Sequence, residues 1–146
     1  MASSEASVSA YRIVAPRWAN SAFSGEGAQK YGGRWNSPGR RVVYLAGSRA
    51  LAALEMLVHL TTPGSRAKPF LIFEVRIPAN LILAAKGGTD RRQEGDSWLA
   101  SGRSAALRVP SVLIPEEPNY LLDPGHPGFG KIAHGSPIDF RFDRRL

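Results

Sequence analysis

Glu55 is the side chain whose type and position most clearly suit chemistry. A helix is predicted over Arg49–Leu60, because Ser48 is a favourable N-cap and a Thr-Thr-Pro-Gly sequence follows the segment. At 100° per residue, one face of this helix is apolar and consists of Leu51, Leu54, Leu57 and Val58. Glu55 falls at the edge of that face, where a partly desolvated carboxylate can stabilise a developing cation or accept a proton. The alternative is a structural glutamate paired with His59 or with an arginine.

A second candidate for ligand contact is the segment Gly32-Gly33-Arg34-Trp35-Asn36. Paired glycines let the backbone approach a ligand closely, while Arg34 and Trp35 add a planar cation and an aromatic ring. The segment lacks the Gly-Lys-Ser/Thr of a phosphate-binding loop, and no strand and helix bracket it as in a dinucleotide fingerprint. A tight turn packed by Trp35 is the alternative interpretation.

Other polar side chains carry weaker signals. Tyr44 lies at the centre of a predicted strand and Ser111 lies in an apolar run, and both positions are more typical of a core than of a ligand site. The histidines at positions 59, 126 and 134 lack the spacing of metal ligands, so we expect no metal. The chain has no cysteine, which excludes disulfides and thiolate nucleophiles.

These residues must be positioned by helices and strands, and the pattern of those elements along the sequence predicts a single α+β domain. The domain is expected over residues 10–146, after a flexible tail over residues 1–9. The expected architecture is compact, with a central, mostly antiparallel β-core and flanking helices. A second helix is predicted over Ser97–Leu107, with Asp96 as its N-cap. A long loop with brief structured pieces is predicted over Pro16–Gly39. The predicted strands are Tyr11–Val14, Val42–Ala46, Pro69–Pro78, Leu81–Ala84, Pro110–Ile114, Tyr120–Leu122 and Phe140–Phe142.

Composition and charge limit the classes of function. The 146 residues are 43% hydrophobic and contain neither a membrane-spanning run nor a signal peptide, so a cytoplasmic globular protein is expected. Nineteen Lys and Arg, fifteen of them Arg, give a net charge of +7. This bias suits a phosphate-rich ligand or nucleic acid, but codon usage in a GC-rich genome explains it equally well. A basic nucleic-acid-binding module without catalysis therefore stays an alternative, although the arginines are scattered and no known nucleic-acid-binding motif is present.

The order of the motifs is more informative than each motif alone. The Gly32–Asn36 segment, Tyr44 and Glu55 have a spacing that resembles the RES-domain family, the toxins of bacterial Xre/RES type II toxin–antitoxin systems. The resemblance extends from Tyr11 almost to the C-terminus and includes Asn119. It implies a fold like that of the ADP-ribosyltransferases, with NAD as the substrate and no further cofactor.

The resemblance also implies an activity and its residues. It implies a toxin that consumes NAD by cleaving the nicotinamide–ribose bond, as a glycohydrolase or a phosphorylase. The alternative is transfer of ADP-ribose to a protein acceptor in nucleotide biosynthesis. By position in the family pattern, Glu55, Arg34 and Tyr44 are expected to be catalytic. The residues expected to bind NAD are Arg12, Arg34, Tyr44 and Ser111. For Ser111, the expected contact is a hydrogen bond either to the ribose or to Glu55 itself.

The same resemblance implies a partner. A free enzyme that destroys NAD would poison its host, so a cognate Xre-type antitoxin is expected to cover the active site. Nucleic acid is then expected to be involved only through the antitoxin, and no membrane is expected. The strongly basic chain makes an acidic face on the partner plausible.

Overall fold

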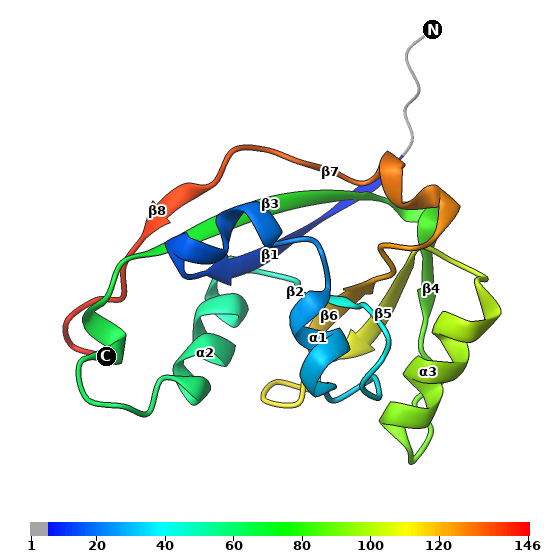
Figure 1. Cartoon of the computed structure of the whole chain (residues 1–146), viewed down its shortest axis with the longest axis horizontal. Coiled ribbons are helices and arrows are strands. Elements are labelled where there is room, and N and C mark those ends of the chain that lie inside the picture. Colours follow the sequence, from blue (N-terminus) through cyan, green and yellow to red (C-terminus); the bar gives the residue numbers. More distant parts are fainter. Residues whose placement is uncertain (1–5) are drawn as a thin grey trace, which may run out of the picture.

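The computed structural model describes residues 6–146, which form one eight-stranded sheet with helices packed against it (Figure 1). Neighbouring strands follow the order β4-β5-β6-β2-β1-β3-β7, and β8 also pairs with β3. The strands are β1 (Ser7–Val14), β2 (Val43–Ala46), β3 (Phe70–Pro78), β4 (Ile82–Ala84), β5 (Ala106–Pro110), β6 (Pro118–Leu122), β7 (Ala133–His134) and β8 (Ile138–Phe140). The helices are α1 (Glu26–Tyr31), α2 (Arg49–His59) and α3 (Arg91–Ser101), with short 3-10 helices at Pro16–Ser21, Ser65–Ala67, Ala79–Leu81 and Pro127–Lys131.

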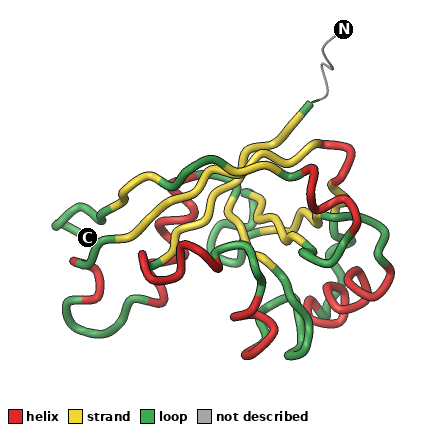
Figure 2. Tube along the Cα trace, turned by 45° about the horizontal axis from the view of Figure 1, so that its top comes forward, coloured by secondary structure: helices red, strands yellow, loops and turns green. Residues whose placement is uncertain are grey.

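The sheet consists of two halves that meet at β1 and β2. β1 pairs with β3 along its whole length, whereas its ladder with β2 is the single pair Tyr11–Ala46. From β2 the sheet continues antiparallel through β6 to β5, and β4 joins β5 in parallel. Figure 2 shows that the resulting sheet is strongly curved. The expectation of an α+β domain with a mostly antiparallel core is confirmed.

The helix predicted after Ser48 is confirmed as α2, and the Ser48 hydroxyl accepts a 3.1 Å hydrogen bond from the Leu51 N–H. Its buried face differs from the predicted one. Leu51 and Ala52 are buried against the sheet, while Leu54 and Val58 are 40% and 52% exposed. The helix is therefore rotated about its axis relative to the predicted orientation, because the side that carries Leu51 and Ala52 is the side packed against the sheet. This rotation leaves Glu55 at the edge of a cleft.

The helix predicted over Ser97–Leu107 is wrong in position. α3 begins at Arg91, because Asp90 provides the N-cap and accepts a 3.0 Å hydrogen bond from the Gln93 N–H. It ends at Ser101, because Gly102 adopts a φ of 64°, a left-handed conformation that favours glycine. Asp96 consequently lies inside the helix, where its carboxylate is free to bind another part of the chain.

Three further boundaries are corrected. The strand predicted over Pro110–Ile114 ends at Pro110, because the Ser111 N–H bonds the Glu117 carbonyl and closes a loop between β5 and β6. Residues Ser7–Ser9, which were expected in the tail, are paired with β3 as the start of β1. Residues 1–5 of that tail lie outside the described residues. The last strand is Ile138–Phe140 instead of Phe140–Phe142, because these residues align with β3 from Ile72 to Phe70.

Two of the apolar clusters matter for the site. One fixes α3 and the segment around Trp35 against β5 and β6, through buried Trp35, Trp98, Leu107, Val109 and Leu121. The other fixes α2 against β1, β2 and β3, through buried Ile13, Ala46, Leu51 and Ile72. The two walls of the cleft are thus anchored separately on the same sheet. Within residues 6–146, the structure contains no helix long and apolar enough to span a membrane.

Candidate active site

A cleft of about 1070 Å³ is lined by residues from distant parts of the chain. α2 forms one wall, the Gly32–Trp35 segment and the first turn of α3 form the other, and β1, β2 and β6 contribute the floor. In Figure 1, α2 and α3 lie on either side of α1, beneath the long strands β1 and β3. A smaller hollow of about 180 Å³ lies between α2 and the strands β1 and β2. The residues that line both are Arg12, Tyr44, Glu55, His59 and Asn119.

Glu55 is held by two side-chain donors on one of its carboxylate oxygens. Its Oε2 accepts a 2.7 Å hydrogen bond from Ser111 Oγ and a 2.8 Å hydrogen bond from Asn119 Nδ2. Ser111 directly follows β5 and Asn119 lies on β6, so these bonds fix the carboxylate of α2 to the half of the sheet that contains β5 and β6. Among the described residues, Oε1 accepts no hydrogen bond, and Glu55 borders both hollows. The arrangement orients a carboxylate and leaves one oxygen for a ligand.

Ser111 supports Glu55 from below and does not line either hollow. Its hydroxyl oxygen accepts hydrogen bonds of 3.2 Å from the backbone N–H groups of Leu113 and Ile114. With these two donors directed at its lone pairs, the hydroxyl proton is directed to Glu55. Ser111 is only 1% exposed. Of the two contacts expected for this serine, ribose or Glu55, the structure has the contact with Glu55.

Arg12 brings a cation to the floor of the cleft. It lies on β1 beside the single β1–β2 pair, and its Nη1 donates a 3.1 Å hydrogen bond to the carbonyl of Tyr44. Burial lowers the pKa of Arg12 from its ordinary value, since the charged form is partly deprived of water. Nε of Arg12 is buried and has no hydrogen-bond partner among the described residues. A buried cation with an unused donor is suited to binding an anion.

Tyr44 supports the Gly32–Asn36 segment. Its hydroxyl donates a 2.6 Å hydrogen bond to Asn36 Oδ1 and accepts one of 3.1 Å from the Trp35 N–H. Burial raises the pKa of Tyr44 above its ordinary value of 10.0. A Cβ on Gly33 would lie 2.6 Å from the Tyr44 hydroxyl, so glycine is required for this close approach. Tyr44 borders the cleft, but its hydroxyl is committed to the loop that carries Arg34.

A second set of contacts fixes the same loop to α3. Asp96 accepts hydrogen bonds from the Ser37 N–H and the Ser37 hydroxyl, at 2.8 and 2.5 Å. Gly95 packs so closely on the loop that an added Cβ would lie 1.7 Å from the Trp35 carbonyl oxygen. The loop is therefore held from both sides, by Tyr44 on β2 and by Gly95 and Asp96 on α3. Such a support fixes the position of the backbone that carries Arg34.

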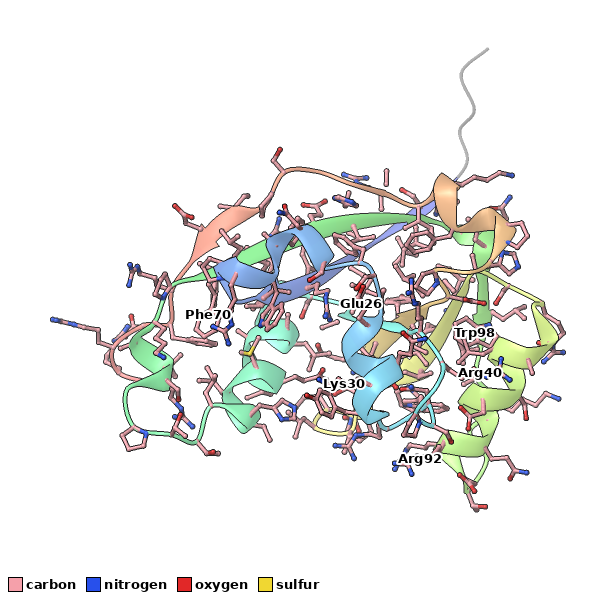
Figure 3. The ribbon with its side chains drawn as sticks, viewed as in Figure 1. Glu26, Lys30, Arg40, Phe70, Arg92 and Trp98 are labelled. Carbon is pink, nitrogen blue, oxygen red and sulfur yellow. The ribbon has the colours of Figure 1, made fainter. Side chains whose placement is uncertain are left out.

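Positive charge gathers on this wall of the cleft. Arg34 is exposed at the edge of its loop, and Arg91 and Arg92 extend the cleft lining at the N-terminal end of α3. Figure 3 places Arg92 at the end of α3 that lies below α1 in this view. Together with Arg12 these side chains surround a space large enough for a nucleotide-sized ligand. Within residues 6–146, no three His, Asp or Glu side chains are grouped so as to hold a metal ion.

The structure brings Arg12, Arg34, Tyr44 and Glu55 to one cleft and puts Ser111 directly behind it. The site residues that sequence reasoning did not assign are Asn119, His59, Arg91 and Arg92. His59 follows Glu55 by one helical turn, a signal that was available in the sequence. Asn119 is part of the family resemblance, but only the β5–β6 pairing reveals its contact with Glu55.

Comparison of the sequence with known proteins gives a family match and named relatives. Residues 9–143 match the model of the RES domain. The chain is 40% identical to "Toxin Res" of Yersinia enterocolitica, an alignment that covers 93% of this chain and 97% of that protein. It is also 40% identical to "Prs ADP-ribosylating toxin" of a Sphingobium species, over 85% of this chain and 86% of the relative.

Comparison with solved structures gives a match in fold. The crystal structure of the M. tuberculosis MbcT–MbcA toxin–antitoxin complex contains a chain that matches with a TM-score of 0.71 and 19% identity. The match covers 94% of this chain and 86% of that one. The chain is thus an α+β domain with the fold found in that complex. The chain belongs to the RES domain family and is one of its toxins.

Proposed function

We propose that this toxin cleaves NAD at the bond between nicotinamide and ribose. The observation that carries the proposal is the geometry of Glu55, whose Oε2 is fixed by Ser111 and Asn119 while the residue borders both hollows. Cleavage of this bond releases neutral nicotinamide from a pyridinium cation and leaves positive charge on the ribose. A fixed carboxylate beside that ribose stabilises the charge as it develops.

The reaction also requires that nicotinamide leaves and that water or phosphate takes its place on the ribose. The C1′–N bond breaks, its electron pair leaves with nicotinamide, and an oxygen of water or phosphate bonds to C1′. When the acceptor is water, its proton goes to a base, and Glu55 is suited to this role through its free Oε1. No metal or thiol is needed for either step. Release of free ADP-ribose then indicates hydrolysis, and release of ADP-ribose with a phosphate on this C1′ indicates phosphorolysis.

The cations of the cleft suit the diphosphate of NAD. Arg12 on the floor has an unused buried donor, and Arg34 on the wall presents a planar fork that pairs two oxygens at once. Binding the diphosphate between them would direct the nicotinamide riboside towards Glu55. Tyr44 contributes by holding the loop of Arg34, and its ring borders the cleft where a nicotinamide would lie.

The direct test is release of nicotinamide from NAD by the purified protein, followed by chromatography. Wild type is expected to release nicotinamide, and Glu55→Gln is expected to reduce the rate by at least about 10²-fold, because it keeps the shape of the side chain and removes its charge. Glu74→Gln is the matched control, since Glu74 is a partly exposed carboxylate on β3 outside the cleft. Equal rates for wild type and Glu55→Gln would refute the mechanism. Salt-sensitive DNA binding without any turnover would favour the nucleic-acid-binding alternative.

ADP-ribosyl transfer to a protein is the second candidate, and the Sphingobium relative supports it by its name. The chemistry at the ribose is the same, but a protein side chain takes the place of water. We propose to separate the two by incubating the toxin with labelled NAD, with and without a cell extract. Label on a protein band supports transfer, whereas free ADP-ribose at an unchanged rate supports hydrolysis.

We also propose that an antitoxin of the Xre type binds this toxin and covers the cleft. The structural neighbour was crystallised in a toxin–antitoxin complex, and an enzyme that consumes NAD must be restrained in its own host. Three exposed apolar side chains, Val58, Val112 and Leu113, line the cleft and suit such a contact.

A further inference from the structure

Two buried side-chain polar atoms within residues 6–146 have no hydrogen-bond partner, and both belong to residues that line the cleft and the smaller hollow. They are Nε of Arg12, a donor, and Oδ1 of Asn119, an acceptor. Buried polar groups in folded proteins are almost always paired, so an unpaired one in a cleft indicates a ligand contact. The proposed function uses the donor for the diphosphate. It leaves the acceptor of Asn119 without a role.

The orientation of the Asn119 amide is fixed by Glu55. Nδ2 lies 2.8 Å from Glu55 Oε2, and turning the amide over would bring two oxygen atoms together at that distance. Nδ2 therefore remains towards Glu55, and Oδ1 is turned away from that carboxylate, on a residue that borders both hollows. The backbone of Asn119 is equally fixed, because it pairs with Ala46 on β2 and Val109 on β5. The acceptor is thus preorganised next to the carboxylate.

We propose that Asn119 accepts a hydrogen bond from the nicotinamide riboside half of NAD and thereby selects substrates that carry that donor. The inference rests on the proposed function and deepens it. Two groups of that half supply N–H or O–H donors, the carboxamide of nicotinamide and the hydroxyls of its ribose. Both lie close to the scissile bond, and Glu55, one hydrogen bond from Asn119, is the residue assigned to that bond.

A site that pairs a buried polar group with a substrate donor discriminates strongly against an analogue without it, because the group is then left unpaired in the complex. Asn119 would therefore have two tasks. Its Nδ2 holds Glu55 in place, a task it shares with Ser111, and its Oδ1 contacts the substrate. The two tasks are separable, since Ser111 borders neither hollow.

The test compares kcat/KM on NAD and on two analogues for wild type, Asn119→Ala and Ser111→Ala. In 3-acetylpyridine adenine dinucleotide, a methyl group replaces the carboxamide nitrogen, so that donor is missing. In the second analogue, fluorine replaces the 2′-hydroxyl of the nicotinamide ribose. Both variants lose one donor to Glu55, but only Asn119→Ala loses the acceptor. For each variant, kcat/KM on NAD is divided by kcat/KM on the analogue, and comparing this ratio between variants cancels the intrinsic reactivity of the analogue.

We expect wild type and Ser111→Ala to prefer NAD over one analogue by the same ratio, and Asn119→Ala to reduce that ratio at least tenfold. A reduced ratio for the acetylpyridine analogue identifies the donor as the carboxamide, and a reduced ratio for the fluorinated analogue identifies it as the 2′-hydroxyl. If Asn119→Ala fails to fold, Asn119→Asp replaces it. This variant keeps the acceptor and the shape but loses the donor to Glu55, so kcat should fall while the preference persists.

Unchanged ratios in Asn119→Ala, a lost preference in Asn119→Asp, or an equal change in Ser111→Ala would overturn the inference and leave the proposed function standing. The absence of nicotinamide release by wild type would overturn the proposed function and, with it, the inference. The two failures are thus distinguishable by the wild-type rate alone.

Discussion

The hydroxyl of Tyr44 donates a 2.6 Å hydrogen bond to Oδ1 of Asn36, so a strand at the centre of the sheet supports the loop that carries Arg34. Asn36 is fully buried, and its Nδ2 donates to the carbonyls of Ala28, Ser37 and Arg40. These hydrogen bonds connect Asn36 to α1 through Ala28, to its own loop through Ser37 and Arg40, and to β2 through Tyr44. A preorganised loop gives up little entropy when it binds an anion. This support accounts for the position of Arg34 in a segment with little regular structure.

Replacing Tyr44 with phenylalanine should loosen this loop. Tyr44→Phe leaves the buried Asn36 Oδ1 and the Trp35 N–H without their partner, and the cost is about 1–3 kcal/mol in the free energy of unfolding. Urea titration at pH 7 measures it. Tyr31→Phe is the matched control, because Tyr31 is 75% exposed, and it should change the free energy by less than about 0.5 kcal/mol. An equal effect of both changes would contradict the role given to Tyr44.

Tyr44 also predicts a dependence of stability on pH. Burial raises the pKa of the folded tyrosine above 10.0, so the unfolded state loses its proton first as the pH rises. The contribution is fully present below pH 10 and is lost as the pH approaches the higher pKa of the folded state. The fall in unfolding free energy above pH 10 should therefore be shallower in Tyr44→Phe. Some slope should remain, since burial also raises the pKa of Tyr120.

Replacing Ser111 should reduce turnover with little effect on binding. Ser111→Ala removes one of the two donors on Glu55 Oε2 and leaves Asn119 in place. A hydrogen bond to a charged group contributes about 1.5–3 kcal/mol, so we expect kcat to fall roughly 10- to 100-fold with KM nearly unchanged. Steady-state nicotinamide release measures both.

Ser104→Ala is the control for this prediction. Ser104 is also buried and hydrogen-bonded, to Trp98 and to the Ala106 carbonyl, but it lies outside the cleft. Its loss should lower stability without changing kcat of the folded protein. If Ser111→Ala retained the full kcat, the orientation of Glu55 by Ser111 would have no catalytic role.

Replacing Arg12 should raise the stability of the protein and abolish its activity. A buried cation without a counter-ion is costly, and Arg12 forms none of the salt bridges found within residues 6–146. Arg12→Met keeps the length of the side chain and removes the charge. We expect about 1–2 kcal/mol of added stability, roughly 3–6 °C in Tm, together with loss of NAD cleavage. A lower Tm or retained cleavage would count against the assignment of Arg12 to the diphosphate.

Arg34→Lys tests the planar fork at the other wall. A lysine keeps the positive charge but cannot pair two phosphate oxygens at once, so KM for NAD should rise about tenfold while stability stays constant. Arg103→Lys is the control, because Arg103 is exposed and lies outside the cleft. Identical KM values for the two variants would show that Arg34 acts only as a point charge.

Local patterns in the sequence predicted several elements well. The helix α2 was predictable because Ser48 caps it and apolar residues recur along it, and β3 because its side chains alternate. The α3 helix was misplaced because Asp90 and Asp96 are both suitable caps by type. Only Asp90 caps the helix, since the carboxylate of Asp96 is bound to Ser37, 59 positions earlier in the chain.

The candidate site, too, could be predicted only in part from the sequence. Spacing and family resemblance predicted roles for Glu55, Arg34, Tyr44, Arg12 and Ser111 from the sequence, but they gave Ser111 two alternative contacts and Asn119 no role. Hydrogen bonds between residues 56 and 64 positions apart decided both. Such contacts depend on which strands become neighbours, and the pairing of β2 with β6 and of β6 with β5 brings them about.

The sequence by itself determined the kind of chemistry available: one carboxylate on a helix edge, an excess of arginine and no cysteine. Residue types and short-range spacing determine these properties, because they need no knowledge of distant contacts. The tertiary structure alone decided how the charges are used. The β1–β2 junction buries Arg12, the β5–β6 loop directs Ser111 and Asn119 at Glu55, and α3 and β2 together fix the loop of Arg34. Each of these depends on the folding of distant segments against one curved sheet.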